Sequence, residues 1–313
     1  VASSIFEFKM QNHLKNEDFA ILYRTNAQSR AMEDALRKRD IPYRIYGGLS
    51  FYQRKEVKDI LAYLRLVVNP KDEESLKRVI NYPPRGIGQT TVDKLVVASK
   101  YHNLSLLETV DRAKELGVPV NVGTLTKLIN FSTLIKRFQI ENEALNAFEI
   151  TDLITKKIGL IQELKKDATP EGIARIENIE ELLNGIRDFT EGQIELADSS
   201  GSLAEFLEDI ALATDADKDD DPNNDRVALM TIHLAKGLEF PYVYIVGLEE
   251  DLFPSAMSLN TRSELEEERR LFYVALTRAK ERALLSYTLS RYRWGKLIDA
   301  EPSRFIEEID PQY

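Results

Sequence analysis

Residues 227–248 read "VALMTIHLAKGLEFPYVYIVGL", and they indicate the class of fold more directly than any other part of the chain. Two apolar runs, 227–233 and 242–248, are separated by a loop that contains one glycine and a carboxylate. Short runs that are apolar throughout are typical of strands buried on both faces, as in a parallel sheet. The stretch therefore predicts an α/β domain with helices on both sides of a parallel sheet.

Other segments repeat this alternation of strands and helices. "FAILYRTN" (19–26) is an apolar run that enters a polar turn, and apolar residues at helical spacing follow over 27–40. "IPYRIYGG" (41–48) predicts a second strand that ends at a glycine pair. Beyond residue 248, a helix is expected over 264–281 and a further strand over 282–289.

The middle of the chain has a different pattern. Leucines and isoleucines recur at three- and four-residue steps from about 54 to 213, which predicts helices and almost no strand. The acidic segment "TDADKDDDPNNDR" (214–226) follows, and we interpret it as a linker interrupted by Pro222. A calcium loop is not expected there, because the sixth position lacks glycine and Arg226 occupies the twelfth, where a bidentate glutamate belongs.

A chain of 313 residues is long for one core, so two domains are expected. The changes of pattern predict an α/β domain formed by residues 1–50 and 217–313, interrupted by a mostly helical insertion over residues 51–216. The chain begins at Val1 and not at methionine, so we expect it to be a piece of a longer protein.

Composition excludes several classes of protein. No apolar run approaches the roughly 18 residues of a membrane span, and no membrane partner is expected. The absence of cysteine removes disulfides and thiolate metal sites and fits a reducing cytoplasm, which is the expected location. The three histidines, His13, His102 and His233, have no metal-ligand spacing, so no metal site is expected.

The net charge of −10 argues at first against a nucleic-acid partner, but the charge is unevenly distributed. Residues 1–100 carry 18 lysines and arginines against 12 aspartates and glutamates, whereas residues 101–220 carry 12 against 24. A phosphate-binding face is therefore expected to come mainly from the first hundred residues. The acidic helices after residue 100 favour a solvated face, with partner docking as an alternative.

Two charged residues flank the predicted strands without an evident partner. Arg278, in "RRLFYVALTRAKER" (269–282), has Val274 and Ala275 one turn before it and no carboxylate. It is either a solvated arginine near a helix C-terminus or a guanidinium that clamps a phosphoryl group from outside the chain. Glu239 either pairs with Lys236 or accepts ribose hydroxyls, because loops at the carboxyl ends of parallel strands bind ligands.

Three long strings carry a family resemblance. "ALMTIHLAKGLEFPYVYIVGLEEDLFP" (228–254) and "EEERRLFYVALTRAKE" (266–281) resemble motifs V and VI of the UvrD/PcrA/Rep group of superfamily 1 helicases. "AILYRTNAQSR" (20–30) is similar to their motif IV. The resemblance implies the carboxy-terminal half of an ATP-dependent 3′-to-5′ DNA helicase of repair or replication. A RecA-like domain (2A) would be interrupted by the helical domain 2B, and a first RecA-like domain outside this chain would be its partner.

The resemblance also implies how a nucleotide is bound. Arg278 corresponds to the arginine finger that meets the γ-phosphate across a cleft, and Glu239, beside Gly237, to the contact with the nucleotide sugar. ATP with Mg²⁺ is the implied cofactor of the complete enzyme, with the metal ligands elsewhere. No G-x-x-x-x-G-K-[ST] phosphate loop occurs in the sequence, so the chain alone is expected to be inactive.

DNA contacts follow from the same resemblance. Single-stranded DNA and a duplex junction are the implied partners, together with possible repair or transcription proteins. The implied single-strand track consists of Arg24, Asn26, Thr231 and His233. Trp294 stands where the family has a base-stacking aromatic, and its neighbours Arg291, Arg293 and Lys296 suit a phosphate track, although a lone tryptophan is otherwise more often core. Ser50 and Ser255 stand where close relatives have a lysine and a histidine that contact DNA, so the DNA contacts at these two positions are expected to be weaker.

The insertion contains the segment "NYPPRGIGQTTVDKL" (81–95). Gly86 and Gly88 allow a tight turn, and Thr90 or Thr91 is expected to cap the next helix, which would leave backbone amides for an anion. With Arg85 beside it, the segment is similar to the family's helix-hairpin-helix-like duplex contact, although an ordinary helix connection has the same pattern. Amide contacts would read phosphate, so no sequence preference is expected.

A function of another class fits the same sequence. The motor fold could persist in a non-catalytic module that only binds DNA or protein. The two alternatives differ in whether Arg278 supports ATP hydrolysis once a first RecA-like domain is supplied.

Overall fold

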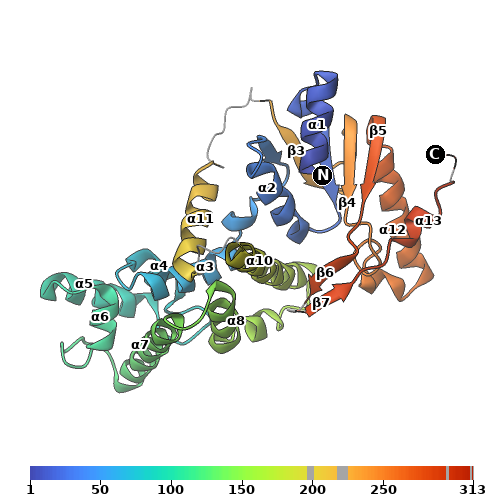
Figure 1. Ribbon diagram of the computed structural model, residues 1–313. Coiled ribbons are helices and arrows are strands. Elements are labelled where there is room, and N and C mark those ends of the chain that lie inside the picture. Colours follow the sequence, from blue (N-terminus) through green and yellow to red (C-terminus); the bar gives the residue numbers. More distant parts are fainter. Residues whose placement is uncertain (196–200, 217–224, 294–295, 311, 313) are drawn as a thin grey trace. The chain divides into compact units, whose positions relative to one another are not determined.

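The computed structural model describes residues 1–195, 201–216, 225–293, 296–310 and 312. The chain forms two compact units, which are coloured along the sequence in Figure 1. The sheet unit consists of Val1–Phe51 with Ala216–Tyr313, and the helical unit of Tyr52–Asp215. Both divisions lie one residue from the positions that the sequence pattern suggested, after residues 50 and 216.

The sheet unit contains a five-stranded sheet in the order β2-β3-β1-β4-β5, and every neighbouring pair is parallel. The strands are β1 (Phe19–Tyr23), β2 (Tyr43–Ile45), β3 (Val227–Thr231), β4 (Phe240–Val246) and β5 (Ala279–Ser286). The predicted α/β class with a parallel sheet is confirmed. The central strand β1 pairs on one side with β3 and on the other with β4, and both partners are distant from it in the sequence.

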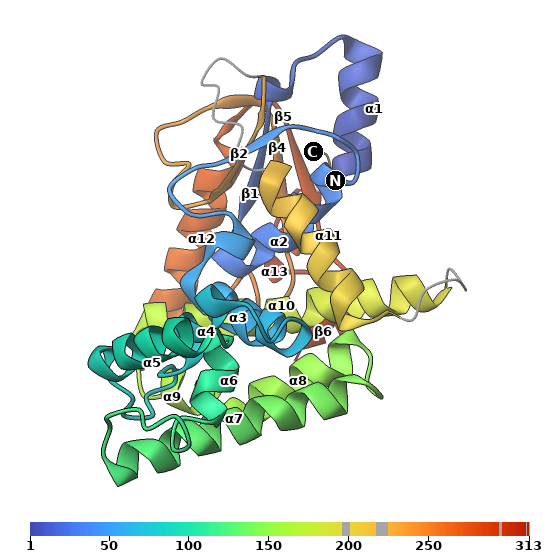
Figure 2. The same ribbon diagram turned by 90° about the vertical axis from the view of Figure 1, so that its left-hand side faces the viewer.

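Both faces of the sheet are buried, which explains the uninterrupted apolar runs. On one face Leu22 and Met230 pack under α12 (Arg262–Leu276) and α13 (Arg304–Glu307). On the other face Ile21 and Leu229 pack under α1 (Ala2–Asn12) and α2 (Ser29–Arg37). Figure 2 shows α12 and α1 on opposite sides of the strands.

The helical unit contains no strand in its described residues. Its helices are α3 (Lys55–Val68), α4 (Glu73–Val79), α5 (Gln89–His102), α6 (Leu106–Asp111), α7 (Val122–Asn142), α8 (Ala147–Ile158), α9 (Leu160–Leu164), α10 (Pro170–Glu195) and α11 (Leu203–Ala216). α3 is apolar on nearly all sides because it packs against α4, α7 and α10 at the centre of the unit. None of the described helices combines the length and apolar character that crossing a membrane requires.

The expected helix over 264–281 is wrong at its carboxyl end. α12 stops at Leu276, and the segment from Ala279 onward is β5. The sequence "AKER" has good helix propensity, but pairing of Ala279 with Phe240 of β4 outweighs it. Arg278 therefore lies in the turn between α12 and β5 and not on the helix.

Other parts of the chain were not anticipated or fall outside the description. The sequence patterns missed α1 and the antiparallel hairpin of β6 (Ser290–Arg293) and β7 (Lys296–Asp299). The expected linker over 214–226 begins too early, since α11 continues to Ala216. Its residues 217–224 lie outside the described residues.

A buried carboxylate joins the sheet to the strand β6. The Glu249 side chain is only 2% exposed and accepts bonds from Arg291 Nε at 2.9 Å and Nη2 at 3.0 Å. The Thr288 amide and hydroxyl each donate to it at 2.9 Å. Burial alone would raise the pKa of Glu249, but Arg291 and Thr288 outweigh burial and hold that pKa below its ordinary value of 4.5.

Arg291→Ala should lower the free energy of unfolding by about 3 kcal/mol at pH 7, because it leaves a buried carboxylate without its cation. Arg270→Ala is the matched control, since Arg270 pairs with Glu267 on an exposed surface where such pairs contribute about 0.5 kcal/mol. Because the folded-state pKa of Glu249 lies below its ordinary value of 4.5, the ionised carboxylate stabilises the fold fully above pH 4.5. This stabilisation is lost progressively as the pH falls below 4.5 and through the folded-state pKa. The difference between wild type and Arg291→Ala, measured by urea unfolding, should therefore shrink below that pH. Equal losses for the two variants at pH 7 would contradict this role of Glu249.

Candidate functional site

Arg278 is held in place without being neutralised. Its Nε donates to the Val274 carbonyl, its Nη1 to the Leu238 carbonyl and its Nη2 to the Thr277 hydroxyl, each at 3.0 Å. The residue is half-buried, and no carboxylate of the described residues forms an ion pair with it. A guanidinium fixed by neutral acceptors keeps its full charge for an anion that arrives from outside the unit.

Glu239 lies next to Arg278 because the residues before and after Glu239 both form hydrogen bonds with Arg278 through their backbone. The Leu238 carbonyl accepts from Arg278, and the Phe240 amide donates to the Arg278 carbonyl at 2.9 Å. The Glu239 carboxylate is exposed, and its ion pair is with Lys280 at 4.0 Å rather than with Lys236, the alternative suggested by the sequence. The structure thus brings Glu239 and Arg278 together.

The turn before Glu239 depends on a glycine. Gly237 has φ +89°, a left-handed conformation that side chains rarely adopt, and open space surrounds its Cα. Because Gly237 and Glu239 precede β4 while Arg278 precedes β5, all three lie at the amino edge of the sheet. The expected position of Glu239 at the carboxyl end of a strand is wrong, since the loop 232–239 crosses to the opposite edge and Glu239 directly precedes β4.

A second group of candidates lies at the carboxyl ends of β1 and β3. Tyr23 pairs with Thr231 in register, and the Ile232 amide donates to the Tyr23 carbonyl at 3.0 Å. Arg24 and His233 therefore leave neighbouring strands at the same edge. Asn26 follows within the 3₁₀ helix η2 (Asn26–Gln28) and is exposed. The predicted track residues of the sheet unit are thus adjacent.

His233 is influenced by its charged neighbours. Partial burial lowers the pKa of His233 below its ordinary value of 6.5, and the positive charge of Arg24 lowers it further, while Glu268 opposes the shift. The imidazole is therefore neutral at physiological pH, and it offers a hydrogen bond and not a charge to a phosphate.

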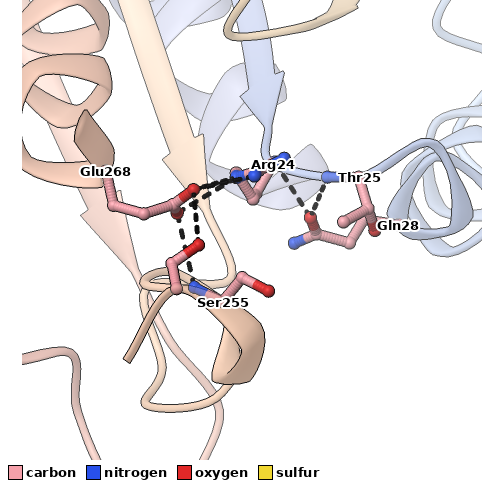
Figure 3. Close-up of polar contacts among 6 residues, drawn as sticks. Arg24, Thr25, Gln28, Ser255 and Glu268 are labelled. Carbon is pink, nitrogen blue, oxygen red and sulfur yellow. Dashed lines mark hydrogen bonds and ion pairs between the residues drawn. The ribbon is translucent and has the colours of Figure 1, made fainter. Parts of the chain in front are cut away.

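Arg24 itself has a carboxylate partner that the sequence analysis missed. Its Nη2 lies 2.7 Å from Glu268 Oε1, and its Nε lies 3.1 Å from both carboxylate oxygens, as Figure 3 shows. The Glu268 side chain is 7% exposed and that of Arg24 22%. The sequence held one signal for this residue, since Glu268 stands four positions before the buried Phe272 and so shares its helix face. The surrounding run "EEERR" concealed that signal because it resembles a solvated face.

Gln28 fixes the backbone at the same point. Its carbonyl oxygen accepts from the amides of Arg24 and Thr25, each at 2.9 Å (Figure 3). Its amide nitrogen donates to the Val246 carbonyl at 3.4 Å, so the ends of β1 and β4 are tied together. Gly247 is required beside it, because a Cβ there would overlap the Gln28 side chain.

The candidates of the helical unit form a group of their own. Arg85 turns into its own unit, where Nη2 donates to the Tyr63 hydroxyl at 2.6 Å and Nη1 to the Val79 carbonyl at 2.9 Å. Gly86 has φ +69°, and Gly88 is the N-cap of α5 with no side-chain cap. The expected cap by Thr90 or Thr91 is wrong, since the helix already begins at Gln89. Thr90 is exposed in the first turn, and Arg85 holds the loop instead of facing outward.

Trp294 lies outside the described residues, and so do the side chains of Arg293 and Lys296. Of its predicted cationic neighbours, Arg291 is half-buried and is bound to the buried Glu249. The described part of the chain contains no group of three or more histidines, aspartates or glutamates that could hold a metal ion.

Arg24→Met should raise the pKa of His233, because the variant removes a positive charge that lowers it. Glu268→Gln should lower the same pKa further, because it removes the opposing negative charge. NMR titration of the imidazole protons checks both shifts, with His13 and His102 as references within the chain. A His233 titration unchanged in both variants would contradict the proximity of the three side chains.

Comparison with known proteins assigns the chain that forms these sites to a family. The family of UvrD-like helicase C-terminal domains matches residues 1–290. The ATP-dependent DNA helicase PcrA of Leuconostoc citreum is 39% identical over 313 residues, which are 100% of this chain and 42% of that protein. PcrA of Staphylococcus aureus (strain Mu50) is 41% identical over 301 residues, or 96% of this chain and 40% of that protein.

A third relative has a different name and similar coverage. DNA helicase II of Haemophilus influenzae is 41% identical over 309 residues, or 99% of this chain and 42% of that protein. The chain thus spans about two fifths of the length of the curated relatives it matches. The family match includes both edges of the sheet, from Arg24 to Arg278, and the chain belongs to the UvrD-like helicase C-terminal domains.

Proposed function

We propose that the chain is the carboxy-terminal part of an ATP-dependent DNA helicase that moves 3′-to-5′ along one strand. The sheet unit would be its second RecA-like motor domain and the helical unit its inserted domain 2B. The observation that supports this most is Arg278, which is fixed by three neutral acceptors and lacks a carboxylate partner among the described residues. The names of the relatives, ATP-dependent DNA helicase PcrA and DNA helicase II, agree with it.

Arg278 would act on a nucleotide that another domain holds. A guanidinium supplied across a cleft stabilises the charge that develops on the γ-phosphate, and in GTPases such a group raises turnover by about 10³–10⁵. Glu239 would accept the ribose hydroxyls, because it lies at the same edge with an exposed carboxylate. Magnesium ligands and most phosphate contacts would come from the first RecA-like domain, so this chain would supply orientation and charge.

The carboxyl ends of β1 and β3 would bind the single strand. Arg24 supplies a cation, Asn26 an exposed amide and Thr231 a hydroxyl, while His233 supplies a neutral imidazole. Such contacts to the sugar–phosphate backbone position a strand without reading its sequence. The loop 232–239 starts at this edge of the sheet and ends at Glu239 on the opposite edge. A movement of the bound DNA strand could therefore be transmitted to Glu239 and Arg278 through one short segment.

The start of α5 would meet the duplex. Its first amides are not capped by a side chain, and Gly86 and Gly88 expose the backbone before them. Helix N-termini of this kind bind phosphates through their N–H groups. Arg85 supports this site indirectly, by holding the loop through Tyr63 and Val79.

Arg278→Ala should abolish DNA-stimulated ATP hydrolysis when the amino-terminal half of the enzyme is supplied in trans, with turnover reduced about 10³-fold or more. Single-stranded DNA affinity should not change, because Arg278 lies at the opposite edge from the track. Arg270→Ala is the matched control, as it removes the same charge from an exposed position of α12.

Two results of this experiment would reject the proposal. Restored turnover that survives Arg278→Ala would remove the arginine-finger role. No turnover in the wild-type mixture, together with intact DNA affinity, would favour a non-catalytic DNA-binding module. A Walker A motif in the reading frame upstream of this chain is expected as independent support for the motor.

A further inference from the structure

We propose that Glu268 is the positioning residue for Arg24, holding one edge of its guanidinium so that the other edge is presented to a phosphate of the bound strand. The inference rests on the proposed single-strand track and adds a residue that carries no DNA contact itself. It also assigns a purpose to a buried acid inside a surface that must bind an anion.

The contacts divide the guanidinium into two edges. Glu268 binds the edge formed by Nε and Nη2, at 3.1 and 2.7 Å. Nη1 has no hydrogen-bond partner within the described parts of the chain, and it is not among the buried polar atoms that lack one. Because arginine has five donors in a rigid plane, fixing one edge also fixes the direction of the other. The free donors of Nη1 are therefore oriented and reachable.

Glu268 is itself held by the loop that follows β4. The Ser255 amide donates to Oε2 at 3.3 Å, and the Ser258 hydroxyl donates to Oε1 at 3.4 Å. Figure 3 shows the Glu268 carboxylate between two groups of donors, with Arg24 beside it and Ser255 below it. The carboxylate thus receives donors from two segments, which prevents it from turning away when Arg24 meets an anion.

Burial makes this arrangement specific. The Glu268 side chain is 7% exposed, so the pair is shielded from solvent screening on the carboxylate side. Gln28 fixes the Arg24 backbone, because its side-chain oxygen accepts a hydrogen bond from the Arg24 amide at 2.9 Å. Arg24 is therefore held at both ends, and a strand would meet an arginine that has little freedom left to lose.

The position of Glu268 also gives the track a connection to the nucleotide edge. Glu268 lies on α12, and the same helix supplies the Val274 carbonyl that accepts from Arg278 Nε. One rigid helix thus contacts Arg24 on one edge of the sheet and Arg278 near the other.

The test measures binding of a labelled oligothymidylate to this chain as a function of salt, for the variants Glu268→Ala, Arg24→Ala and the double variant. Loss of positioning should weaken binding about tenfold in Glu268→Ala and reduce the salt slope by about one, although the variant removes a negative charge. Arg24→Ala should have the same effect, and the double variant should be no weaker than either single one. Glu267→Ala is the matched control, because it removes the same charge from the adjacent exposed position and should not weaken binding.

A second readout does not depend on DNA. The Arg24 Nε–H proton, bound to a buried carboxylate, should give a resolved NMR signal in the wild type and in Glu267→Ala and should lose it in Glu268→Ala. If Glu268→Ala does not fold, Glu268→Gln replaces it. That variant keeps one acceptor oxygen, so it should weaken binding a few-fold and broaden the signal.

The outcomes separate the two proposals. DNA binding that is unchanged or tighter in Glu268→Ala while Arg24→Ala weakens it would overturn the positioning role, since Glu268 would then only compete with phosphate. A retained Arg24 Nε–H signal in Glu268→Ala would overturn it as well. Loss of that signal with unaltered DNA binding in Arg24→Ala would support positioning and would instead reject Arg24 as part of the strand track.

Discussion

The parallel pairing of β1 with both β3 and β4 is the constraint on which the sheet unit depends. β1 comes about two hundred residues before its partners, yet Ile21 lies in register with Leu229 on one side and Tyr244 on the other. Since β2 also pairs with β3, the helical unit is inserted between two adjacent strands. It therefore takes the place of the crossover connection that any pair of parallel strands requires.

The same constraint places the two candidate sites at opposite edges. A chain that leaves the carboxyl end of β3 must return to the amino end of β4, because the strands are parallel. The loop 232–239 makes this passage without a helix of its own and carries His233 at its start and Glu239 at its end. α12 and the turn after it make a second passage in the same direction, from Glu268 to Arg278. The proposed contacts with the DNA strand and with the nucleotide are thus joined by two short segments of the chain.

Sequence patterns predicted the strands well because burial on both faces leaves an unambiguous apolar run, as at Phe19–Tyr23. They failed where tertiary pairing overrides local preference, as at Ala279, whose helix-forming neighbours join β5. The family motifs predict roles for Arg278 and Glu239, but neither motif nor periodicity showed that neutral acceptors hold Arg278. The sequence also did not indicate that Arg85 points into its own unit, because a polar loop has the same pattern whether its arginine is exposed or buried.

Two buried acid–arginine pairs of the sheet unit show how a structural pair differs from a poised one. Glu249 is saturated, since Thr288 and Arg291 together direct four donors at its two oxygens. Its pairing serves the fold, and an additional anion there would meet only repulsion. Glu268 also receives four donors, two from Arg24 and two from Ser255 and Ser258, but Arg24 gives the carboxylate only one edge, and its Nη1 has no hydrogen-bond partner in the described residues. An arginine with donors left over is the element of such a pair that can recruit a phosphate, and the buried carboxylate determines where those donors point.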